Sequence, residues 1–404
     1  MRSAFLAFLL ALPLPVLSAA PPATVEIDGA FLAQLKAHPD PAILEAVRAE
    51  ADKAMTVGPY SVMDKSETPP SGDKHDYMSL APYWWPNPAT PHGLPYIRRD
   101  GEVNPDRYTV KDDGEFNKVQ SAVHALGLGY YLTGNEAYAA RAVLLLRTWF
   151  LDPATRMNPN LNYAQAVMGV NNGRGTGLID VRGLPRLLDG LTLLSGSPAL
   201  TQQDETGLHK WFSGYLDWLE TSKNGHDEAD AKNNHGSWFD QQITGIALFL
   251  GNKDLARRVG NAAKTKRIAF QIKPDGSAPL ELVRTKSFSY SVFNLTALEW
   301  LAVESRQAGV DLWSYRSPEG ASIRVDLDYL LPYAEGAKTW THQAINGVDG
   351  GSLVEPLLLA AMNCHDAAYL AAAQKLGNHS DAETLLLEAE AEQMLHFHTT
   401  AAGD

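Results

Sequence analysis

Cysteine is nearly absent from this chain of 404 residues, which has one, Cys364. A single thiol excludes an intramolecular disulfide framework and any multi-cysteine zinc or iron–sulfur cage. Charged residues make up 20% of the chain and hydrophobic residues 45%. That balance excludes the intrinsically disordered, collagen and coiled-coil classes, and it supplies enough apolar material to bury a large core.

An excess of basic residues is also lacking. The chain carries 34 Lys and Arg against 47 Asp and Glu, for a formal net charge of -13. Nucleic acid is disfavoured as a partner, because binding to its phosphates needs a basic face. The same reasoning disfavours, less strongly, a polyanionic substrate.

Residues 1–20 have the pattern of a secretory signal peptide. Arg2 supplies the positive start, an apolar stretch runs from Ala4 to Val16, and small residues follow at the cleavage site. The apolar stretch is shorter than the roughly 20 residues that a membrane-spanning helix needs. We therefore expect a mature chain, residues 21–404, that is periplasmic or secreted from a bacterium and has no membrane partner.

Helical periodicity dominates the mature chain, and strand signals are sparse. Apolar residues recur at i, i+3, i+4 and i+7 almost to the C-terminus. The expected helices are Pro41–Met55, Glu115–Leu132, Glu136–Leu151, Leu178–Leu194, Gln202–Thr221, Ser237–Leu250, Lys253–Phe270, Ser287–Ser305, Val325–Tyr333, Ser352–Met362, Ala367–Leu376 and Asp381–His396. Brief turns such as Thr133-Gly134-Asn135 and Gly251-Asn252 separate them. With no linker and no exact repeat period, we expect an all-α single domain, an α/α toroid of about six to seven helical hairpins.

Four irregular segments interrupt the helices, and in a toroid they would rim one mouth and carry the chemistry. They are Ser61–Arg107, Asn158–Gly177, Asn224–Gly236 and Gln271–Lys286. The first is rich in aromatic residues and proline around Tyr83, Trp84 and Trp85. These rings either close the end of the toroid as core or form a platform for sugar rings. Positive charge close by in sequence comes from Lys74, His75, Arg98 and Arg99.

The second segment contains the glycine-rich run Asn171-Asn172-Gly173-Arg174-Gly175-Thr176-Gly177. Glycine allows close approach of the backbone to a ligand, and the N-terminus of the following helix suits an anion. The Lys-Ser/Thr ending of a phosphate-binding loop is absent, and a plain turn is the alternative.

The third segment ends in Lys232-Asn233-Asn234-His235-Gly236-Ser237-Trp238, just before an expected helix. An Asn amide can polarise a carboxylate, and a neutral His can accept a proton near pH 7. A purely structural His is the alternative. Metal binding is disfavoured, because no second His or Cys lies at ligand spacing.

The fourth segment leads through Arg284 and Lys286 into a helix that contains Tyr290. Tyr290 is either a core residue or a proton donor and acceptor. In the second case the neighbouring positive charges are expected to lower its phenol pKa.

A glycoside hydrolase stays open as an alternative at this point. No GxSxG motif of a serine hydrolase is present. Paired carboxylates could still come from residues near the candidate loops. These are Asp180, Asp227, Asp230, Asp240 and Glu281.

Taken together, Tyr83-Trp84-Trp85-Pro86-Asn87-Pro88, the NNHG motif at Asn233–Gly236 and the Arg284…Tyr290 spacing resemble the alginate-lyase-domain superfamily of polysaccharide lyases. The resemblance covers roughly Asp76 to Tyr369. The NNHG motif is similar to that of lyase family 38, whose members act on alginate or glucuronan. Family 5 alginate lyases carry a related NNHS motif, from which Gly236 departs.

The resemblance implies an α/α toroid and a metal-independent β-elimination on a 1,4-linked polyuronate, without a cofactor. It implies that Asn234 and Asn172 (or Asn171) stabilise the charge that builds on the C6 carboxylate, with Arg284 holding that carboxylate or tuning Tyr290. His235 or Tyr290 would remove the C5 proton, and Tyr290 would protonate the leaving oxygen. The expected substrate-binding residues are Lys74, His75, Tyr83, Trp84, Trp85, Asn171, Arg174, Asn233, Trp238 and Lys286. A non-catalytic periplasmic glycan-binding protein is the alternative outside the enzymes.

An anionic substrate sets a local requirement on an acidic protein. Salt screens charges that lie more than about 8 Å apart, so binding of the substrate depends on the local electric field rather than on the net charge of the protein. We therefore expect a basic cleft built from residues near the four segments. They are Lys74, His75, Arg98, Arg99, Arg107, Lys118, Arg174, Arg284 and Lys286.

Overall fold

The computed structural model describes residues 20–377 and 380–401, and side chains as far as residue 396. The predicted signal peptide lies outside the described residues, apart from Ala20. The long helices are α1 (Gly29–Ala37), α2 (Pro41–Ala54), α3 (Asp112–Thr133), α4 (Glu136–Leu146), α5 (Leu184–Leu193), α6 (Gln202–Thr221), α8 (Asn234–Phe249), α9 (Lys253–Ala263), α12 (Ser287–Gln307), α13 (Ile323–Ala334), α14 (Val354–Cys364), α15 (Ala367–Leu376) and α16 (Ala382–Ala401). The short ones are α7 (Lys223–Ala229), α10 (Ala269–Gln271) and α11 (Pro279–Leu282). Within the described part of the chain, no helix is both long and apolar enough to cross a membrane.

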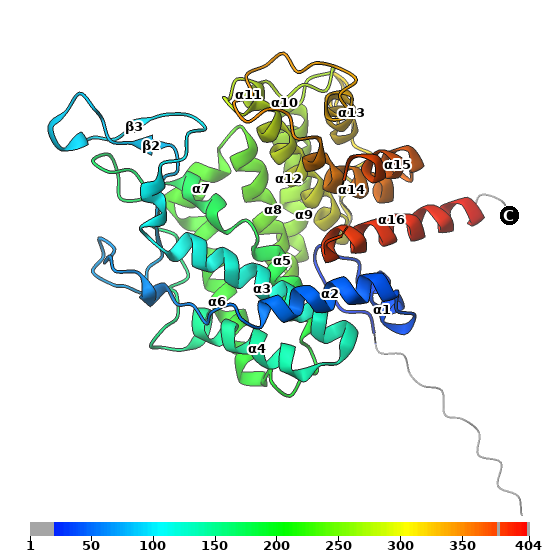
Figure 1. Ribbon diagram of the computed structural model, residues 1–404, viewed down its shortest axis with the longest axis horizontal. Coiled ribbons are helices and arrows are strands. Elements are labelled where there is room, and N and C mark those ends of the chain that lie inside the picture. Colours follow the sequence, from blue (N-terminus) through cyan, green and yellow to red (C-terminus); the bar gives the residue numbers. More distant parts are fainter. Residues whose placement is uncertain (1–19, 378–379, 402–404) are drawn as a thin grey trace, which may run out of the picture.

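The inner helices form a closed ring. Helix α3 packs against α5, α5 against α8, α8 against α12, α12 against α14 and α14 against α16. Helix α16 then packs against α2, which returns to α3. Outer helices such as α4, α9, α13 and α15 each pack on an inner neighbour. Figure 1 shows the last helix, α16, beside the first two. The predicted all-α single-domain toroid is confirmed.

The predicted helical turns are confirmed where glycine and asparagine meet. Gly134 ends α3 in the left-handed region at φ 71°, and the Asn135 side chain then caps α4 by accepting from Ala137 N–H. Gly251 has φ 75°, and Asn252 caps α9 in the same way. A glycine that accepts positive φ followed by a side-chain cap reverses the chain between two helices.

The third irregular segment is more helical than expected. Residues Lys223–Ala229 form α7, which the Ser222 hydroxyl caps by accepting from Gly225 N–H. Helix α8 begins at Asn234, three residues earlier than predicted, so Asn234 and His235 lie in its first turn. The apolar pattern did not indicate these turns, because a cap and a buried acid, Glu228, hold α7 in place.

Two small sheets lie in the irregular segments. Strand β1 (Met78–Leu80) pairs in parallel with β4 (Tyr163–Ala166), which brings the first and second segments together. Strands β2 (Trp84–Trp85) and β3 (Ile97–Arg98) pair antiparallel. The loop that carries β2 and β3 projects beyond the helices (Figure 1). The short parallel pair therefore explains how distant segments reach one mouth.

A partly buried charge network lies where the ring closes. Arg186 of α5 forms ion pairs with Glu26 before α1, with Glu355 of α14 and with Glu383 of α16. The carboxylate of Asp189 accepts hydrogen bonds from the backbone N–H groups of residues 25, 26 and 27. These contacts attach both ends of the described chain to α5.

Thermal stability is expected to fall as the pH rises from about 5 to about 8. Burial raises the pKa of Glu26 to about 8 and that of Glu383 to about 7, although Arg186 partly offsets both. A carboxyl with a raised pKa binds its proton more tightly in the folded than in the unfolded state. Its stabilising contribution is therefore present at low pH and lost as the pH passes through the folded pKa. We expect a Tm lower by a few degrees at the higher pH, measured by calorimetry.

Substitution of Glu26 tests the cause of this dependence. Glu26→Gln should flatten part of the fall in Tm, whereas Glu45→Gln, at an exposed position on α2, should leave it unchanged. An unchanged pH dependence in Glu26→Gln would contradict the assignment to this carboxyl.

Candidate active site

The N-terminal ends of several inner helices meet at one cavity of about 570 Å³. Asn117 comes from the start of α3, Asn234 and His235 from the first turn of α8, and Tyr290 from the first turn of α12. The segment before α5 adds Asp180 and Arg182. Helix N-termini carry a partial positive charge, so their convergence favours an anionic ligand.

Tyr290 lies in a cationic and aromatic surrounding. Its hydroxyl donates a hydrogen bond to the Tyr83 hydroxyl over 2.8 Å. The guanidinium carbon of Arg284 lies 3.8 Å from the centre of the Tyr290 ring. Arg284 also donates to both carboxylate oxygens of Asp100, at 2.8 to 3.1 Å. Arg284 is thus fixed beside the phenol, in the position that tuning Tyr290 requires.

The expected lowering of the Tyr290 pKa is wrong. Burial is the largest influence and raises the pKa of Tyr290, and the hydrogen bond to Tyr83 raises it further. Arg284 lowers it, but only in part. Closeness in sequence correctly indicated Arg284 as a neighbouring cation, but it did not show that the Tyr290 phenol is buried. Tyr290 is therefore a neutral phenol that carries its proton near pH 7.

His235 is oriented by a buried acid. Its Nδ1 lies 2.6 Å from Oε1 of Glu228, which is 2% exposed. An ionised carboxylate can only accept a hydrogen bond, so this contact favours a proton on Nδ1. The Nε2 atom of the neutral ring is then left as a proton acceptor.

Asn234 is held from two sides by Glu281. Its backbone N–H and its side-chain Nδ2 each donate to one oxygen of that carboxylate, both over 2.7 Å. An amide nitrogen carries two hydrogens, so one remains after this contact. The pair fixes the amide at the cavity wall.

The next position of the motif, Gly236, is required by a close approach. A Cβ there would lie 2.2 Å from Nη1 of Arg267 and 2.3 Å from the carbonyl oxygen of Ala231. Arg267 is fully buried, forms an ion pair with Asp240 and donates to the carbonyl oxygens of Ala229 and Ala231. Gly236 thus leaves room for the arginine that ties α7 to α8.

The cavity lining also contains a strained residue, Gln165. It has φ 48°, in the left-handed region that non-glycine residues rarely adopt. Its backbone N–H donates to Ser79, and its side chain donates to Asp180 and accepts from Arg174. Such strain costs about 1–3 kcal/mol and persists where surrounding contacts over-determine it, often at functional sites. The Arg174 guanidinium also faces the Trp84 ring at 5.9 Å.

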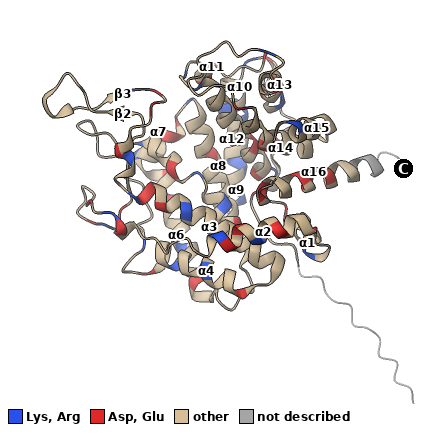
Figure 2. Ribbon diagram, viewed as in Figure 1, with Lys and Arg blue, Asp and Glu red and all other residues tan. Residues whose placement is uncertain are grey.

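The cavity lining is predominantly basic. Five arginines line it against two carboxylates, Asp113 and Asp180. The arginines are Arg98, Arg107, Arg174, Arg182 and Arg284. Over the chain as a whole, acidic and basic positions are interspersed along the helices (Figure 2). A basic cleft on an acidic body is therefore present, but only Arg98, Arg107, Arg174 and Arg284 of the nine predicted residues line it, and Lys74, His75, Arg99, Lys118 and Lys286 do not.

Of the residues predicted for the site, the cavity brings together Tyr83, Trp84, Arg174, Asn233, Asn234, His235, Arg284 and Tyr290. Lys286 lies close by, with Nζ 5.8 Å from the centre of the Tyr83 ring. Trp238 points to a neighbouring cavity instead. Trp85 does not line the cavity and donates from its indole to the carbonyl oxygen of Glu102.

Four predicted residues lie away from this lining. Asn172 is exposed, and the Asn171 side chain accepts from Val167 N–H within its own turn. An isolated bridge joins Val167 and Asn171, and neither Asn171 nor Asn172 lines the cavity. His75 contacts the carbonyl oxygen of Arg156 through Nδ1, and the Lys74 carbonyl accepts from Lys65. None of these four residues lines the cavity.

A sequence model of the alginate lyase family matches residues 61–340. A crystal structure of an alginate lyase from Bacteroides ovatus is 37% identical, with a TM-score of 0.86 over 91% of this chain and 99% of that one. The chain belongs to the alginate lyase family. It is therefore a polysaccharide lyase by family. No curated protein sequence matches it significantly.

More distant structures share the fold of this lyase. A histidine-to-alanine variant of alginate lyase A1-III complexed with a tetrasaccharide is 18% identical, with a TM-score of 0.57 over 88% of this chain and 91% of that one. Alginate lyase A1-III from Sphingomonas species A1 gives 18% identity and a TM-score of 0.54, over 86% and 89%. At this identity the likeness supports the toroid alone.

Four of the five carboxylates that kept a hydrolase open are engaged by other groups of the lyase and do not line the cavity. Asp240 pairs with Arg267, Glu281 accepts from Asn234, and the exposed Asp227 and Asp230 pair with lysines. Asp180 alone of the five lines the cavity, and its burial raises its pKa to about 6. No group of three or more His, Cys, Asp or Glu side chains in the described ranges is arranged to hold a metal ion.

Sequence reasoning missed several residues of the lyase site. Glu228, Arg182, Gln165 and Asn117 were not singled out. Glu228 stands seven positions before His235, which would have signalled an acid for the imidazole had α7 been recognised. Arg182 and Asn117 stand in stretches that were predicted as helices, Leu178–Leu194 and Glu115–Leu132, and no local motif marks them.

Glu228→Gln is expected to lower kcat of the lyase by about 10-fold or more. An amide can donate to Nδ1, which would favour the wrong tautomer of His235 and remove the free acceptor at Nε2. The measurement is the rate of turnover of a polyuronate at a saturating substrate concentration. Glu228→Asp, which keeps an acceptor, should retain more activity, and equal loss in both variants would contradict a role in orienting the imidazole.

Proposed function

We propose that this lyase cleaves 1,4-linked polyuronates by β-elimination and leaves a 4,5-unsaturated uronate at the new end. The observation that carries the proposal is the meeting of Tyr290, His235 and Asn234 in one arginine-lined cavity. The Bacteroides ovatus relative is named an alginate lyase, and A1-III was crystallised with a tetrasaccharide. Alginate is therefore the first substrate to consider.

Removal of the C5 proton places negative charge on the C6 carboxylate, which must be stabilised in the transition state. Preorganised donors aimed at such charge are among the strongest catalytic devices. The remaining amide hydrogen of Asn234 is one such donor. Arg174 uses Nε and Nη2 on Gln165, which leaves Nη1 for the carboxylate. We assign Arg174 the part expected of Asn172, which lies outside the cavity.

Two proton transfers complete the elimination. Tyr290 holds its proton in the free enzyme and is placed to protonate the leaving C4 oxygen. In mannuronate and glucuronate, proton and leaving group lie on the same face of the ring, so Tyr290 can serve both steps by giving its hydroxyl proton to the leaving C4 oxygen and taking the C5 proton in its place. In guluronate they lie on opposite faces, and Nε2 of His235 is the natural base.

Mannuronate-rich alginate or glucuronan is the substrate that we propose, because it matches a Tyr290-centred elimination. The proposed steps use side chains alone, with neither metal nor cofactor. We also propose that the protein belongs to the branch nearest to lyase family 38 and that it is periplasmic or secreted. They rest on the NNHG motif and on residues 1–20 respectively.

A panel of polymannuronate, polyguluronate and glucuronan tests the proposal. Elimination should raise the ultraviolet absorbance of the conjugated double bond, and product masses should show unsaturated ends. Reducing ends without this chromophore would indicate a hydrolase instead. Binding of oligouronates with no product would indicate a glycan-binding protein, and silence on all three polymers would reject the substrate class.

A further inference from the structure

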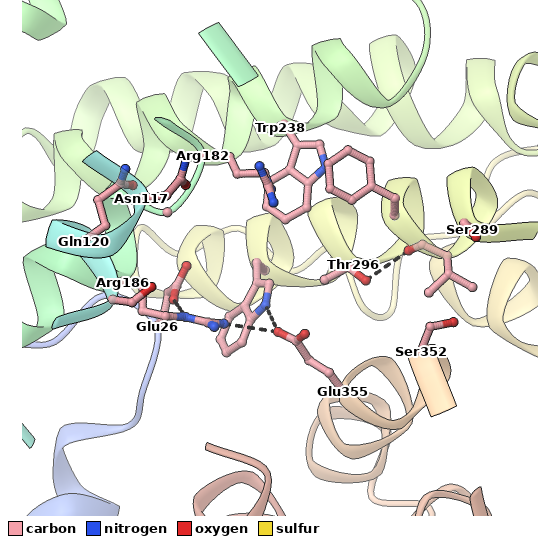
Figure 3. Close-up of a pocket in the computed structure, with 15 residues that line it drawn as sticks. Glu26, Asn117, Gln120, Arg182, Arg186, Trp238, Ser289, Thr296, Ser352 and Glu355 are labelled. Carbon is pink, nitrogen blue, oxygen red and sulfur yellow. Dashed lines mark hydrogen bonds and ion pairs between the residues drawn. The ribbon is translucent and has the colours of Figure 1, made fainter. Parts of the chain in front are cut away.

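The five arginines that line the cavity with His235 and Tyr290 differ in how their charge is compensated. Three of them form ion pairs, which are Arg98 and Arg284 with Asp100 and Arg107 with Asp113. Arg186, in a neighbouring cavity, is also bound by carboxylates, and Figure 3 shows its contacts with Glu26 and Glu355. A guanidinium that is already paired has less to offer a ligand, because the carboxylate of the protein competes for its N–H groups.

The other two arginines of the cavity, Arg174 and Arg182, form no ion pair among the described residues. Arg182 also lines the neighbouring cavity (Figure 3), and the hydrogen bond of its guanidinium, to the carbonyl oxygen of Ile179, is long at 3.4 Å. Arg174 is held more firmly, and by a single residue. Its Nε donates to the backbone carbonyl oxygen of Gln165 at 3.2 Å, and its Nη2 donates to Oε1 of the same residue at 2.9 Å. Arg174 is therefore both fixed in place and left without a compensating carboxylate.

The unusual backbone of Gln165 explains how one residue supplies both acceptors. In a regular strand the carbonyl lies in the plane of the sheet and the side chain stands perpendicular to it, so the two oxygens rarely meet one partner. Strand β4 departs from this geometry, because three steps along it, from Tyr163 to Ala166, match two steps along β1. Gln165 lies in this bulge, at φ 48°. Bulges often re-aim a side chain next to an active site.

Buried partners hold Gln165 in this conformation. The Ser79 hydroxyl accepts from the Gln165 backbone N–H at 2.7 Å and donates to Asp180. The side-chain Nε2 of Gln165 donates to Oδ1 of Asp180, also over 2.7 Å. An ionised carboxylate can only accept, so this bond sets the orientation of the amide. The nitrogen faces Asp180, and the oxygen is left for Arg174.

The contacts with Gln165 use one side of the Arg174 guanidinium. The hydrogens that remain on Nη1 and Nη2 include the pair at the end of the group, which can bind a carboxylate through two parallel hydrogen bonds. We propose that Gln165 is the positioning residue for this end of Arg174. Its strained backbone and its amide fix the guanidinium so that the free end meets the C6 carboxylate of the substrate. The inference rests on the proposed elimination, and it adds that folding stability is given up at Gln165 to orient a charge.

A double-mutant cycle in the full-length chain tests this role. Gln165→Met keeps the length of the side chain and removes its two hydrogen bonds, so it should lower kcat/KM on polymannuronate by about 10-fold or more. Because Gln165 acts through Arg174, the same substitution in an Arg174→Ala background should change kcat/KM by less than about 2-fold. Gln203→Met, on the exposed surface of α6, is the matched control and should leave kcat/KM and Tm unchanged. Equal losses in both backgrounds would overturn the proposal, since a residue that only stabilises the fold lowers activity whether or not Arg174 is present.

Thermal stability tests the strain separately. Glycine is the less strained residue at a left-handed position, so Gln165→Gly should have a Tm about 1–3 °C above that of Gln165→Ala. At Gln203, inside a helix, the order should be reversed, because glycine is the poorer helix former. A Tm of Gln165→Ala equal to or above that of Gln165→Gly would overturn the statement that stability is given up at this residue.

Binding measurements separate this inference from the proposed reaction. If the wild type forms no unsaturated product, the reaction is rejected, and the same cycle is measured as the Kd of a mannuronate tetrasaccharide by calorimetry. Weaker binding in Gln165→Met that disappears in the Arg174→Ala background would still support the positioning role. Cleavage by the wild type with no effect of Gln165→Met would overturn that role and leave the reaction standing. Neither cleavage nor binding by the wild type would reject the substrate class, and the positioning role with it.

Discussion

Tyr290→Phe is expected to lower kcat by about 10²-fold or more, with little change in KM. The substitution removes only the hydroxyl, so the ring remains under the guanidinium of Arg284, 3.8 Å away. It removes the proton that the leaving C4 oxygen needs, and it breaks the hydrogen bond to Tyr83. Because substrate contacts elsewhere in the cavity stay in place, the loss should fall on the chemical step. Initial rates on polymannuronate, followed by ultraviolet absorbance, measure it.

Tyr60→Phe is the matched control for this variant. Tyr60 lies outside the cavity, and Lys118 faces its ring at 5.5 Å. The control should retain wild-type kcat and Tm. Turnover in Tyr290→Phe within a few fold of the wild type would remove Tyr290 from the role of acid.

His235→Ala is expected to lower kcat by about 10²-fold or more on guluronate-containing polymers. In the proposed mechanism the imidazole is the base on the face opposite the leaving oxygen, and Glu228 holds it in place at 2.6 Å. On mannuronate the loss should be smaller if Tyr290 carries both proton transfers. Comparison of the two polymers therefore separates a base from a binding residue.

His38→Ala controls for removal of an imidazole at an exposed position at the end of α1. It should leave kcat unchanged on both polymers. Equal turnover of guluronate blocks by wild type and His235→Ala would exclude the imidazole as the base. Loss of Tm in His235→Ala alone would instead indicate that Glu228, left buried without its partner, destabilises the fold.

Much of the helical architecture could be predicted from apolar spacing. Gln202–Thr221 and Ala367–Leu376 were predicted with the bounds that the structure has. The turns that contain a glycine and a capping asparagine could be predicted equally well. Residues 224–229 were not, because α7 depends on a serine cap and on the burial of Glu228 rather than on an apolar face.

The candidate site was predictable where a motif is local and not where it is assembled across the ring. Asn234, His235 and Tyr290 stand in short motifs at helix starts, and they meet in the cavity. Asn172 stood in an equally suggestive run, yet the turn that ends at Asn171 leaves it in solvent. The sequence did not indicate Arg182, because only the folded chain shows that this residue lines two adjoining cavities.

The contact between α16 and α2 has a consequence for the order of folding. The backbone N–H of Ala382 donates to Glu50, 332 residues earlier in the chain. Contacts of such sequence separation carry a large loop-closure entropy and are slow to form. The arc from α3 to α12, which holds the cavity, joins nearer neighbours and can assemble before this seam. The ring is thus a curved stack of hairpins that becomes a circle at its last step.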